Sequence, residues 1–198
     1  MILSDKGIRT SLGEGALTIT PFDDRLVKRN SYLLRLHTAF RRIDTDAVLD
    51  TADPDALAAA AGRLTEADSI VLTPDSLVLG CSAERLGLAA DMVGLLSGVS
   101  DLARLGVQIH CTSQLVNAGF AHSRPSRVVF ELSTVGGRKV LLHAGTPICH
   151  LVLFTLCSPT TYPHPSGRTG QDGPEPSRLL QQFGHFYAAE PPSPSLPA

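Results

Sequence analysis

The chain has 198 residues, of which 43% are hydrophobic and 18% are charged, and its formal net charge is −2. This length suffices for one domain with a sizeable core but not for two full domains. A net charge so close to zero lacks the cationic surplus that binding to a nucleic-acid polymer requires, so we expect no such partner. Any phosphate binding must come from a few local arginines and backbone amides.

The N-terminus and the cysteines indicate a reducing compartment. Asp5 and Lys6 stand where a secretory signal peptide has its apolar core, and no stretch approaches the ~18 apolar residues of a membrane span. Each cysteine lies alone in an apolar run, which predicts buried, unpaired thiols. The cysteines are Cys81, Cys111, Cys149 and Cys157. We therefore expect a cytoplasmic protein that does not interact with a membrane.

No pattern in the sequence suggests a metal ion. The spacings C-x-x-C, H-x-E and H-E-x-x-H, which bring zinc ligands close together, are all absent. A zinc site assembled from neighbouring His and Cys residues is therefore not expected, and no other cofactor is expected in the protein.

The first forty residues predict one helix and two strands. Ser4 is a suitable N-cap for a helix in which Ile8 and Leu12, four residues apart, form the buried face. Residues 17–20 alternate apolar and hydroxyl side chains, which predicts a strand with one buried face, and residues 32–36 show a similar pattern.

The remainder of the chain predicts β structure. Glycine turns recur at short intervals from residue 70 onward, and short strands between such turns indicate an all-β barrel or jelly roll with a few short helices. Residues 148–156 are almost wholly apolar and should form a central strand. Residues 44–68 are expected to be a surface excursion with an alanine-rich helix at 56–63.

The sequence G-V-S-D-L-A-R-L-G at residues 98–106 is the first candidate for chemistry. A glycine-bounded turn followed by one helical turn puts Ser100 and Arg104 four residues apart, on one face of the helix. A hydroxyl and a guanidinium placed in this way can hold an anion or a water molecule. The simpler interpretations are a helix N-cap for Ser100 and an exposed helical arginine for Arg104.

The second candidate is Glu131, the one carboxylate within an apolar run. Strands are expected at residues 107–112 and 128–132, with a turn at 115–120 between them. Apolar surroundings would raise the pKa of Glu131 above its ordinary value of ~4.3 and suit it to proton transfer. The simpler interpretation places Glu131 at a strand end on the solvated face.

Segments throughout the chain match one family in residue type and order. They are M-I-L-S-D-K-G-I at 1–8, E-G at 14–15, P-F-D at 21–23, N-S-Y and L-R-L within 30–36, residues 71–106, and G-Q-D-G-P with S-R within 170–178. In these segments the chain resembles the dCTP deaminase family, relatives of the trimeric dUTPases. The resemblance implies a dUTPase-like β domain over 1–160 and a nucleotide-closing segment over 161–180. The proline-rich residues 181–198 are expected to be disordered.

The resemblance also implies a function. It points to a metal-independent hydrolytic deaminase that converts a cytosine nucleotide or nucleoside to the uracil form and releases ammonia. Glu131 takes the family's general-base position, and Ser100 and Arg104 hold the water and orient the carboxylate and phosphates. Further positions that match substrate contacts are Val99, Asp101, Ser113, Gln114, Asn117, Val129, His150, Tyr162 and Gln171. The family's sites form between subunits, so a homotrimer is expected, with Mg²⁺ needed only for a nucleoside triphosphate.

The chain departs from the family where phosphates are held. Val99 replaces an arginine and Asp101 replaces a serine, so one cation is lost and one anion is gained. We therefore expect weaker triphosphate binding and a substrate with fewer phosphates than dCTP, or none. Arg124 or Arg127, near a short insertion at residues 122–126, could restore a cation from another direction.

Other departures leave two alternative functions open. Asn117 replaces an aspartate that helps dUTPases to activate water, so a dUTP diphosphatase is the least favoured hypothesis. A catalytically silent nucleotide-binding or regulatory relative is supported by the changed phosphate pocket and opposed by the presence of Glu131. Leu33 replaces an acidic residue, and Gly167 and Arg168 replace a Lys-Tyr pair.

Overall fold

The computed structural model describes residues 1–43, 48–74, 76–111, 113–161 and 169–187. Within them, thirteen strands form three antiparallel sheets. The six-stranded sheet holds β1 (Leu17–Thr20), β4 (Ala39–Ile43), β5 (Leu64–Glu66), β7 (Leu77–Leu88), β9 (Val107–Gln108) and β11 (Ser126–Thr134). The five-stranded sheet holds β2 (Val27–Lys28), β3 (Ser31–Arg35), β8 (Met92–Gly98), β10 (Leu115–Val116) and β13 (Pro147–Thr155), and the two-stranded sheet holds β6 (Ser69–Leu72) and β12 (Val140–His143).

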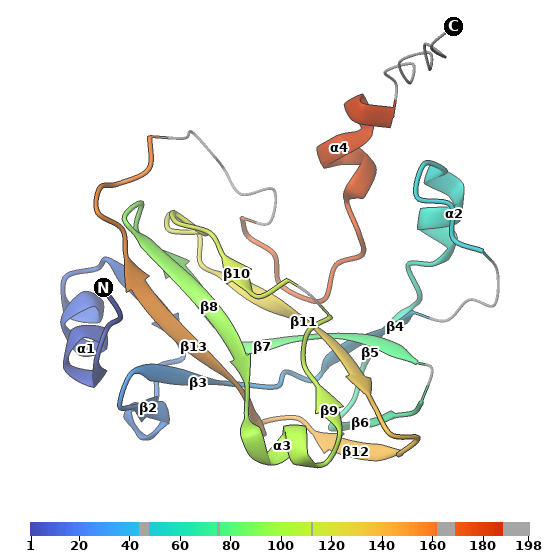
Figure 1. The fold of residues 1–198 in the computed structure, drawn as a ribbon, viewed down its shortest axis with the longest axis horizontal. Coiled ribbons are helices and arrows are strands. Elements are labelled where there is room, and N and C mark those ends of the chain that lie inside the picture. The colour runs from blue at the N-terminus through green and yellow to red at the C-terminus, as the bar shows by residue number, and fades with distance from the viewer. Residues whose placement is uncertain (44–47, 75, 112, 162–168, 188–198) are drawn as a thin grey trace, which may run out of the picture.

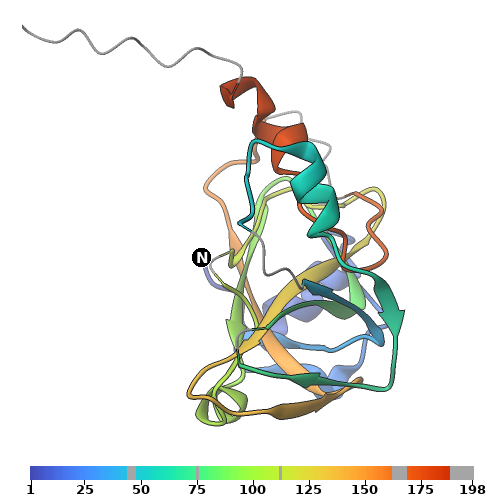
Figure 2. The ribbon, with the colours of Figure 1, turned by 90° about the vertical axis from the view of Figure 1, so that its right-hand side faces the viewer.

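Five short helices accompany the sheets in the described residues. They are α1 (Asp5–Gly13), the 3₁₀ helix η1 (Asp24–Leu26), α2 (Pro54–Ala59), α3 (Ser100–Arg104) and α4 (Leu179–Tyr187). Figures 1 and 2 show α2 and α4 together at one end of the molecule and α3 at the other end. The predicted all-β fold class with a few short helices is confirmed.

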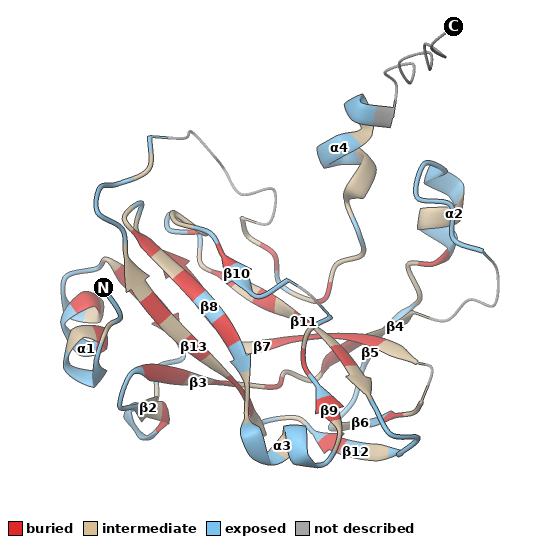
Figure 3. Cartoon of the chain, viewed as in Figure 1, coloured by how far each residue is buried: buried red, intermediate tan, exposed pale blue. Residues whose placement is uncertain are grey.

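The core lies between the two large sheets. The strand order is β5-β4-β7-β11-β9 in one sheet, with β1 also paired to β7, and β10-β8-β13-β3-β2 in the other. Buried and partly exposed side chains alternate along β8, β11 and β13, as expected for strands with one face on the core. Figure 3 shows this alternation as red and lighter bands.

The local predictions for the first helix and for two of the strands are confirmed. The Ser4 hydroxyl accepts a hydrogen bond from the Gly7 amide at 3.3 Å at the start of α1, and Ile8 is fully buried. The strand expected at residues 17–20 is β1, and the apolar run at 148–156 is the central strand β13.

Several boundaries differ from prediction. The strand expected at 107–112 is limited to β9, because the chain leaves the sheet after pairing with only two residues of β11. The turn expected at 115–120 starts as strand β10, which pairs with β8. The surface excursion contributes β5 to the six-stranded sheet, and its helix, α2, starts two residues earlier than expected and ends four residues earlier.

Two of the predicted buried thiols are exposed, because they lie outside the strands. Cys81 and Cys149 are buried within β7 and β13, whereas Cys111 and Cys157 follow the ends of β9 and β13. The boundary predicted for the disordered tail is also wrong, since residues 181–187 belong to α4. Residues 188–198 lie outside the described part of the chain.

Candidate active site

Glu131 lies on β11, which is held between β7 and β9. Its neighbours in the strand, Phe130 and Leu132, are fully buried in the core. Successive side chains on a strand point to opposite faces, so the Glu131 carboxylate lies on the face turned away from the core. The Glu131 amide donates to the Ile109 carbonyl at 3.1 Å, which fixes the backbone there.

The pairing of β11 with β7 is irregular at one point, but β11 itself stays regular. The register shifts between Arg127 and Val129, and the extra residues lie on β7. At the shift, the amide of the buried Val128 donates to the Ser82 hydroxyl at 2.9 Å. Buried and partly exposed residues alternate along β11 across the shift, so Val129 and Glu131, two residues apart, share the outer face.

The Glu131 carboxylate is partly buried and has a perturbed proton affinity. Burial raises the pKa of Glu131, and the Cys111 amide, which donates to Oε2 at 3.4 Å, acts in the opposite direction. The pKa of the Cys111 thiol is raised by partial burial and then by the charge of Glu131, which shows how close the two groups lie. A carboxylate with a raised pKa is well suited to accept a proton and pass it on.

A large open cavity of about 1530 Å³ surrounds Glu131. Its walls come from β11, from β10 and the turn after it, from the segment around residue 171, and from α2 and α4. The predicted site residues that it brings together are Ser113, Asn117, Val129, Glu131 and Gln171. Segments far apart in the sequence thus line one cavity together with Glu131.

Residues 169–174, which we call the strap, are fixed against β11. The Arg127 amide donates to the Gln171 carbonyl at 3.0 Å, and the Gln171 side-chain amide donates to the Arg127 carbonyl at 3.1 Å. The Gly170 amide donates to the Ser126 hydroxyl at 2.6 Å. Gln171 is only 4% exposed, so its position beside the cavity is set by reciprocal hydrogen bonds rather than by the loop alone.

A carboxylate between two arginines completes the attachment of the strap. Asp172 forms ion pairs with Arg85 and, at 3.3 Å, with Arg127. The Arg127 guanidinium also donates to the Ser82 carbonyl at 2.8 Å and to that of Ala83. Arg127 is therefore committed to structural contacts, and the hypothesis that it restores a phosphate-binding cation is not supported.

The helix α3 and its N-cap carry four of the predicted residues outside this cavity. The Arg104 guanidinium, 77% exposed, pairs with Asp101 at 2.8 Å, and neither they nor Ser100 line the Glu131 cavity. Val99, rather than Ser100, occupies the N-cap position, and no side chain caps the helix. A single chain therefore does not assemble Ser100, Arg104 and Glu131 into one site.

The other predicted contacts are dispersed. His150 lines a second, smaller cavity, and Gln114 is exposed and lines neither. Tyr162, Gly167 and Arg168 lie outside the described residues.

The sequence interpretation missed three features of the site. The Cys111 amide donates to Glu131, and Asp172 anchors the strap. His110, next to Cys111, has a buried Nδ1 with no hydrogen-bond partner among the described residues. Residue spacing in the sequence does not predict any of the three features, although Asp172 lies within the G-Q-D-G-P segment that carries part of the family resemblance.

The described residues contain neither a metal-binding cluster nor a membrane-spanning helix. No group of three or more His, Cys, Asp or Glu side chains lies close enough together there to hold a metal ion. No helix in the described ranges has both the length and the apolar character needed to cross a membrane.

Comparison with known proteins gives consistent matches. A family model described as dCTP deaminase-like matches residues 2–156. A curated protein of Mycobacterium ulcerans (strain Agy99), named dCTP deaminase, dUMP-forming, is 35% identical over 190 residues, covering 92% of this chain and 98% of that protein. A protein of the same name from Beutenbergia cavernae is 35% identical over 193 residues, covering 92% of this chain and 97% of that protein.

A solved structure shares the fold. The crystal structure of 2′-deoxycytidine 5′-triphosphate deaminase from Agrobacterium tumefaciens matches with a TM-score of 0.60 at 18% identity. The match covers 77% of this chain and 47% of that chain. It agrees with the all-β architecture described above.

Proposed function

The chain belongs to the dCTP deaminase-like family, and from this premise we propose that it hydrolytically deaminates a cytosine nucleotide, releasing ammonia and leaving the uracil form. The observation that carries the proposal is the partly buried Glu131 carboxylate, with its raised pKa, in a cavity that Gln171 of the strap also lines. The relatives named dCTP deaminase support the same reaction class.

In the proposed mechanism Glu131 transfers the protons. The carboxylate takes a proton from a water molecule as the water oxygen bonds to C4 of the cytosine ring. The bond between C4 and the exocyclic amine then breaks, and the amine leaves as ammonia. The water oxygen stays on C4, one of its protons ends on the departing ammonia and the other on ring N3. Glu131 is returned unchanged, so one carboxylate serves as base and then as acid.

The position of α3 supports a site shared between copies of the chain. Ser100 and Arg104 are exposed and lie outside the Glu131 cavity of their own chain, so we propose that they complete the cavity of a neighbouring copy in a homotrimer. Light scattering tests the assembly, and a fully active monomer would contradict it.

Exposed apolar side chains support such an assembly. Leu95 and Leu115 lie opposite each other on β8 and β10 and are 36% and 58% exposed. Val71 and Leu141 form a second exposed pair on β6 and β12. Burying such pairs against another copy removes apolar surface from water.

We propose that the reaction needs no metal ion at the chemical step, with Mg²⁺ bound only through a triphosphate substrate. Activity on a nucleoside or monophosphate should then survive prolonged treatment with a chelator. Loss of that activity, with recovery on adding back stoichiometric zinc, would contradict the proposal.

The charges at α3 support a substrate with few phosphates. Val99 brings no charge where the resemblance implies an arginine, and Asp101 adds a carboxylate beside Arg104. Arg127, which could have supplied another cation, is paired with Asp172. We therefore propose a preference for substrates with fewer phosphates than dCTP. Ammonia release from dCTP, dCMP, CMP, deoxycytidine and cytidine tests it; a kcat/KM for dCTP tenfold above the others would contradict it.

A second candidate is favoured by the relatives' names, which specify dUMP formation. This reaction would also release pyrophosphate from a triphosphate. Asn117 lines the Glu131 cavity, but an amide cannot accept a proton from water as a carboxylate can. We therefore propose deamination alone, and the absence of pyrophosphate among the products of dCTP tests it. A protein that binds nucleotides but releases no ammonia would instead be a silent relative.

A further inference from the structure

Arg41, on β4, contacts two separate walls of the Glu131 cavity. Its Nε donates a hydrogen bond to the Pro174 carbonyl at 3.0 Å, at the end of the strap. Its Nη1 donates to the Ala61 carbonyl at 3.1 Å and to the Gly62 carbonyl, just beyond α2. One partly buried guanidinium therefore joins two segments that are distant in the sequence.

Arg41 lies in the same row of the six-stranded sheet as Glu131. Leu79 on β7 is paired with Glu131 on one side and with Arg41 on the other. Residues directly opposite one another in antiparallel strands have their side chains on the same face. Arg41 therefore lies on the outer face with Glu131, two strand spacings or about 10 Å away. Arg41 does not line the cavity, so it acts on a substrate only through the segments that it holds.

The segment after α2 lies directly against β4. Gly62 has a φ of +58°, and a Cβ at this position would lie 1.8 Å from the Arg42 carbonyl oxygen. Only glycine allows two backbones to approach so closely in this conformation. Ala60 and Ala61, at the end of α2, line the cavity. The close contact at Gly62 and the Arg41 guanidinium together attach this wall to the sheet, and a cation near the last carbonyls of a helix is favourable.

The strap contacts arginines on three neighbouring strands. Arg127 on β11 and Arg85 on β7 pair with Asp172. Arg41 on β4 holds Pro174, two residues further along the strap. The three residues that follow Pro174 line the cavity, and α4 starts soon after them. Arg41 therefore fixes the point from which the chain continues to the α4 wall.

The two walls that Arg41 contacts belong to the same end of the molecule. Figures 1 and 2 show α2 and α4 together there, and both helices line the Glu131 cavity. Binding is weaker when the walls of a site must be ordered by the ligand. We propose that Arg41 is a positioning residue for substrate binding, which holds the α2 wall and the strap wall of the Glu131 cavity together. This inference rests on the proposed function, in which the Glu131 cavity receives the substrate.

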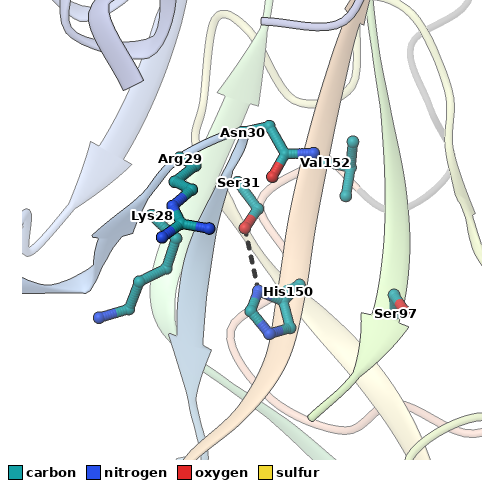
Figure 4. A pocket seen from close by; sticks show the side chains of 7 residues that line it. All are labelled: Lys28, Arg29, Asn30, Ser31, Ser97, His150 and Val152. Atoms are coloured by element: carbon teal, nitrogen blue, oxygen red, sulfur yellow. Dashed lines mark hydrogen bonds between the residues drawn. The ribbon is translucent and has the colours of Figure 1, made fainter. Parts of the chain in front are cut away.

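The contacts of Arg41 are confined to one cavity. The second cavity, whose lining side chains Figure 4 shows, includes neither Arg41 nor any residue that Arg41 contacts through these hydrogen bonds. A substitution of Arg41 should therefore change the Glu131 cavity alone.

Amide hydrogen exchange of the full chain, measured by mass spectrometry without substrate, tests whether Arg41 joins the two walls. Arg41→Met keeps an unbranched side chain but removes every donor. We expect residues 54–62 and 169–174 both to exchange at least about fivefold faster than in the wild type, because local opening becomes easier. The circular dichroism spectrum and Tm establish that each variant is folded.

Arg42→Met is the matched control, because it removes a guanidinium from the next position of the same strand. Arg42 donates to the Val71 carbonyl at 3.1 Å and lines neither cavity. Successive side chains on a strand point to opposite faces, so Arg42 lies on the other face from Arg41. Both segments should exchange in this control as they do in the wild type.

Kinetics test whether the joined walls serve the substrate. In Arg41→Met the KM for dCMP and for deoxycytidine should rise at least about fivefold with kcat within about twofold, because the direction of Glu131 is set by β11. Arg42→Met should keep the wild-type KM. A general loss of folded protein would lower the apparent kcat and leave KM unchanged, so this pattern separates positioning from stability.

Arg41→Lys carries the test if Arg41→Met does not fold. It keeps the charge, but one ammonium cannot occupy the positions of both Nε and Nη1, so KM should still rise at least about twofold. Faster exchange in neither segment or in only one segment of Arg41→Met would overturn the proposal. So would an unchanged KM, or equal changes in Arg42→Met.

Failure of the proposed reaction would be recognised separately. If the wild type releases no ammonia, the same comparison of variants is made on the Kd for dCMP from calorimetric titration. A Kd that is equal in the wild type and Arg41→Met would then overturn the positioning role, and a Kd raised in Arg41→Met alone would support it. The exchange measurement needs neither turnover nor ligand.

Discussion

Glu131 and the helix α3 are both implicated in catalysis by the family resemblance, but the fold treats them differently. Glu131 lies inside a sheet, where the ladders to β7 and β9 and the regular alternation of β11 fix its direction. Ser100 and Arg104 lie on a five-residue helix with no capping side chain, and Arg104 is 77% exposed. The comparison teaches that one chain fixes the direction of the proposed proton-transfer group, whereas the groups proposed to hold water and anions lie on its surface.

The largest effect is expected for Glu131→Gln. The amide has nearly the shape of the carboxylate but cannot accept the water's proton, so kcat should fall at least about 10²-fold, the lower range for a positioned base. Substrate affinity, measured by calorimetry, should change little. A kcat within tenfold of the wild type would show that Glu131 is not the base.

The second-largest effect on activity is expected for a substitution on the helix α3. Arg104→Ala should lower kcat/KM about 10- to 100-fold if the guanidinium makes a charged contact in a neighbouring copy. Mixing this variant with Glu131→Gln under conditions of subunit exchange should restore activity, because about a quarter of the sites in random trimers would receive both intact groups. Steady-state ammonia release is the measurement.

The matched control for this experiment is a mixture of Arg104→Ala with Ser100→Ala. Both substitutions lie on α3, so no site in the mixture receives an intact helix and activity should not return. Restoration in this control, or no restoration in the first mixture, would refute the shared site.

A smaller effect is expected at the strap. Asp172→Asn removes the ion pairs to Arg85 and Arg127 but keeps the size of the side chain. Because Asp172 is 71% exposed, its ion pairs are weak, and KM should rise about two- to fivefold with kcat nearly unchanged. Added salt should raise the wild-type KM toward that of the variant.

The control for the strap is Glu14→Gln, which removes an exposed carboxylate from the end of α1 that lines neither cavity. It should leave KM unchanged. If Asp172→Asn also leaves KM unchanged at every salt concentration, the ion pairs do not position Gln171.

The smallest expected effect is on stability. Burial raises the folded-state pKa of Glu131 above its ordinary value, so the ionised carboxylate is disfavoured in the folded state. The contribution of the protonated Glu131 to the stability of the folded state is complete below the unfolded-state pKa. It is lost as pH rises through the folded-state pKa. Glu131→Gln should therefore have a slightly higher Tm than the wild type at pH 7, with the difference disappearing near pH 4. A lower Tm at pH 7 would contradict this sign.

Local signals in the sequence were sufficient for much of the fold. The N-cap at Ser4, the alternation in β1 and the apolar run of β13 each depend on residues within a few positions of one another, so periodicity and capping rules identified them. The raised pKa of Glu131 was predicted from its apolar sequence neighbours, but its cause is different. Phe130 and Leu132 point into the core, whereas the carboxylate is partly buried on the opposite face.

The remaining features depend on contacts between distant segments. Asp172 meets Arg85 and Arg127 across 87 and 45 positions, and no periodicity links them. The same contacts attach Arg127 to the strap, and the early end of β9 exposes Cys111. Residue types determined which groups can donate, accept or be buried. Only the folded chain determines which partner each group meets, because closing long loops selects among many chemically equivalent pairings.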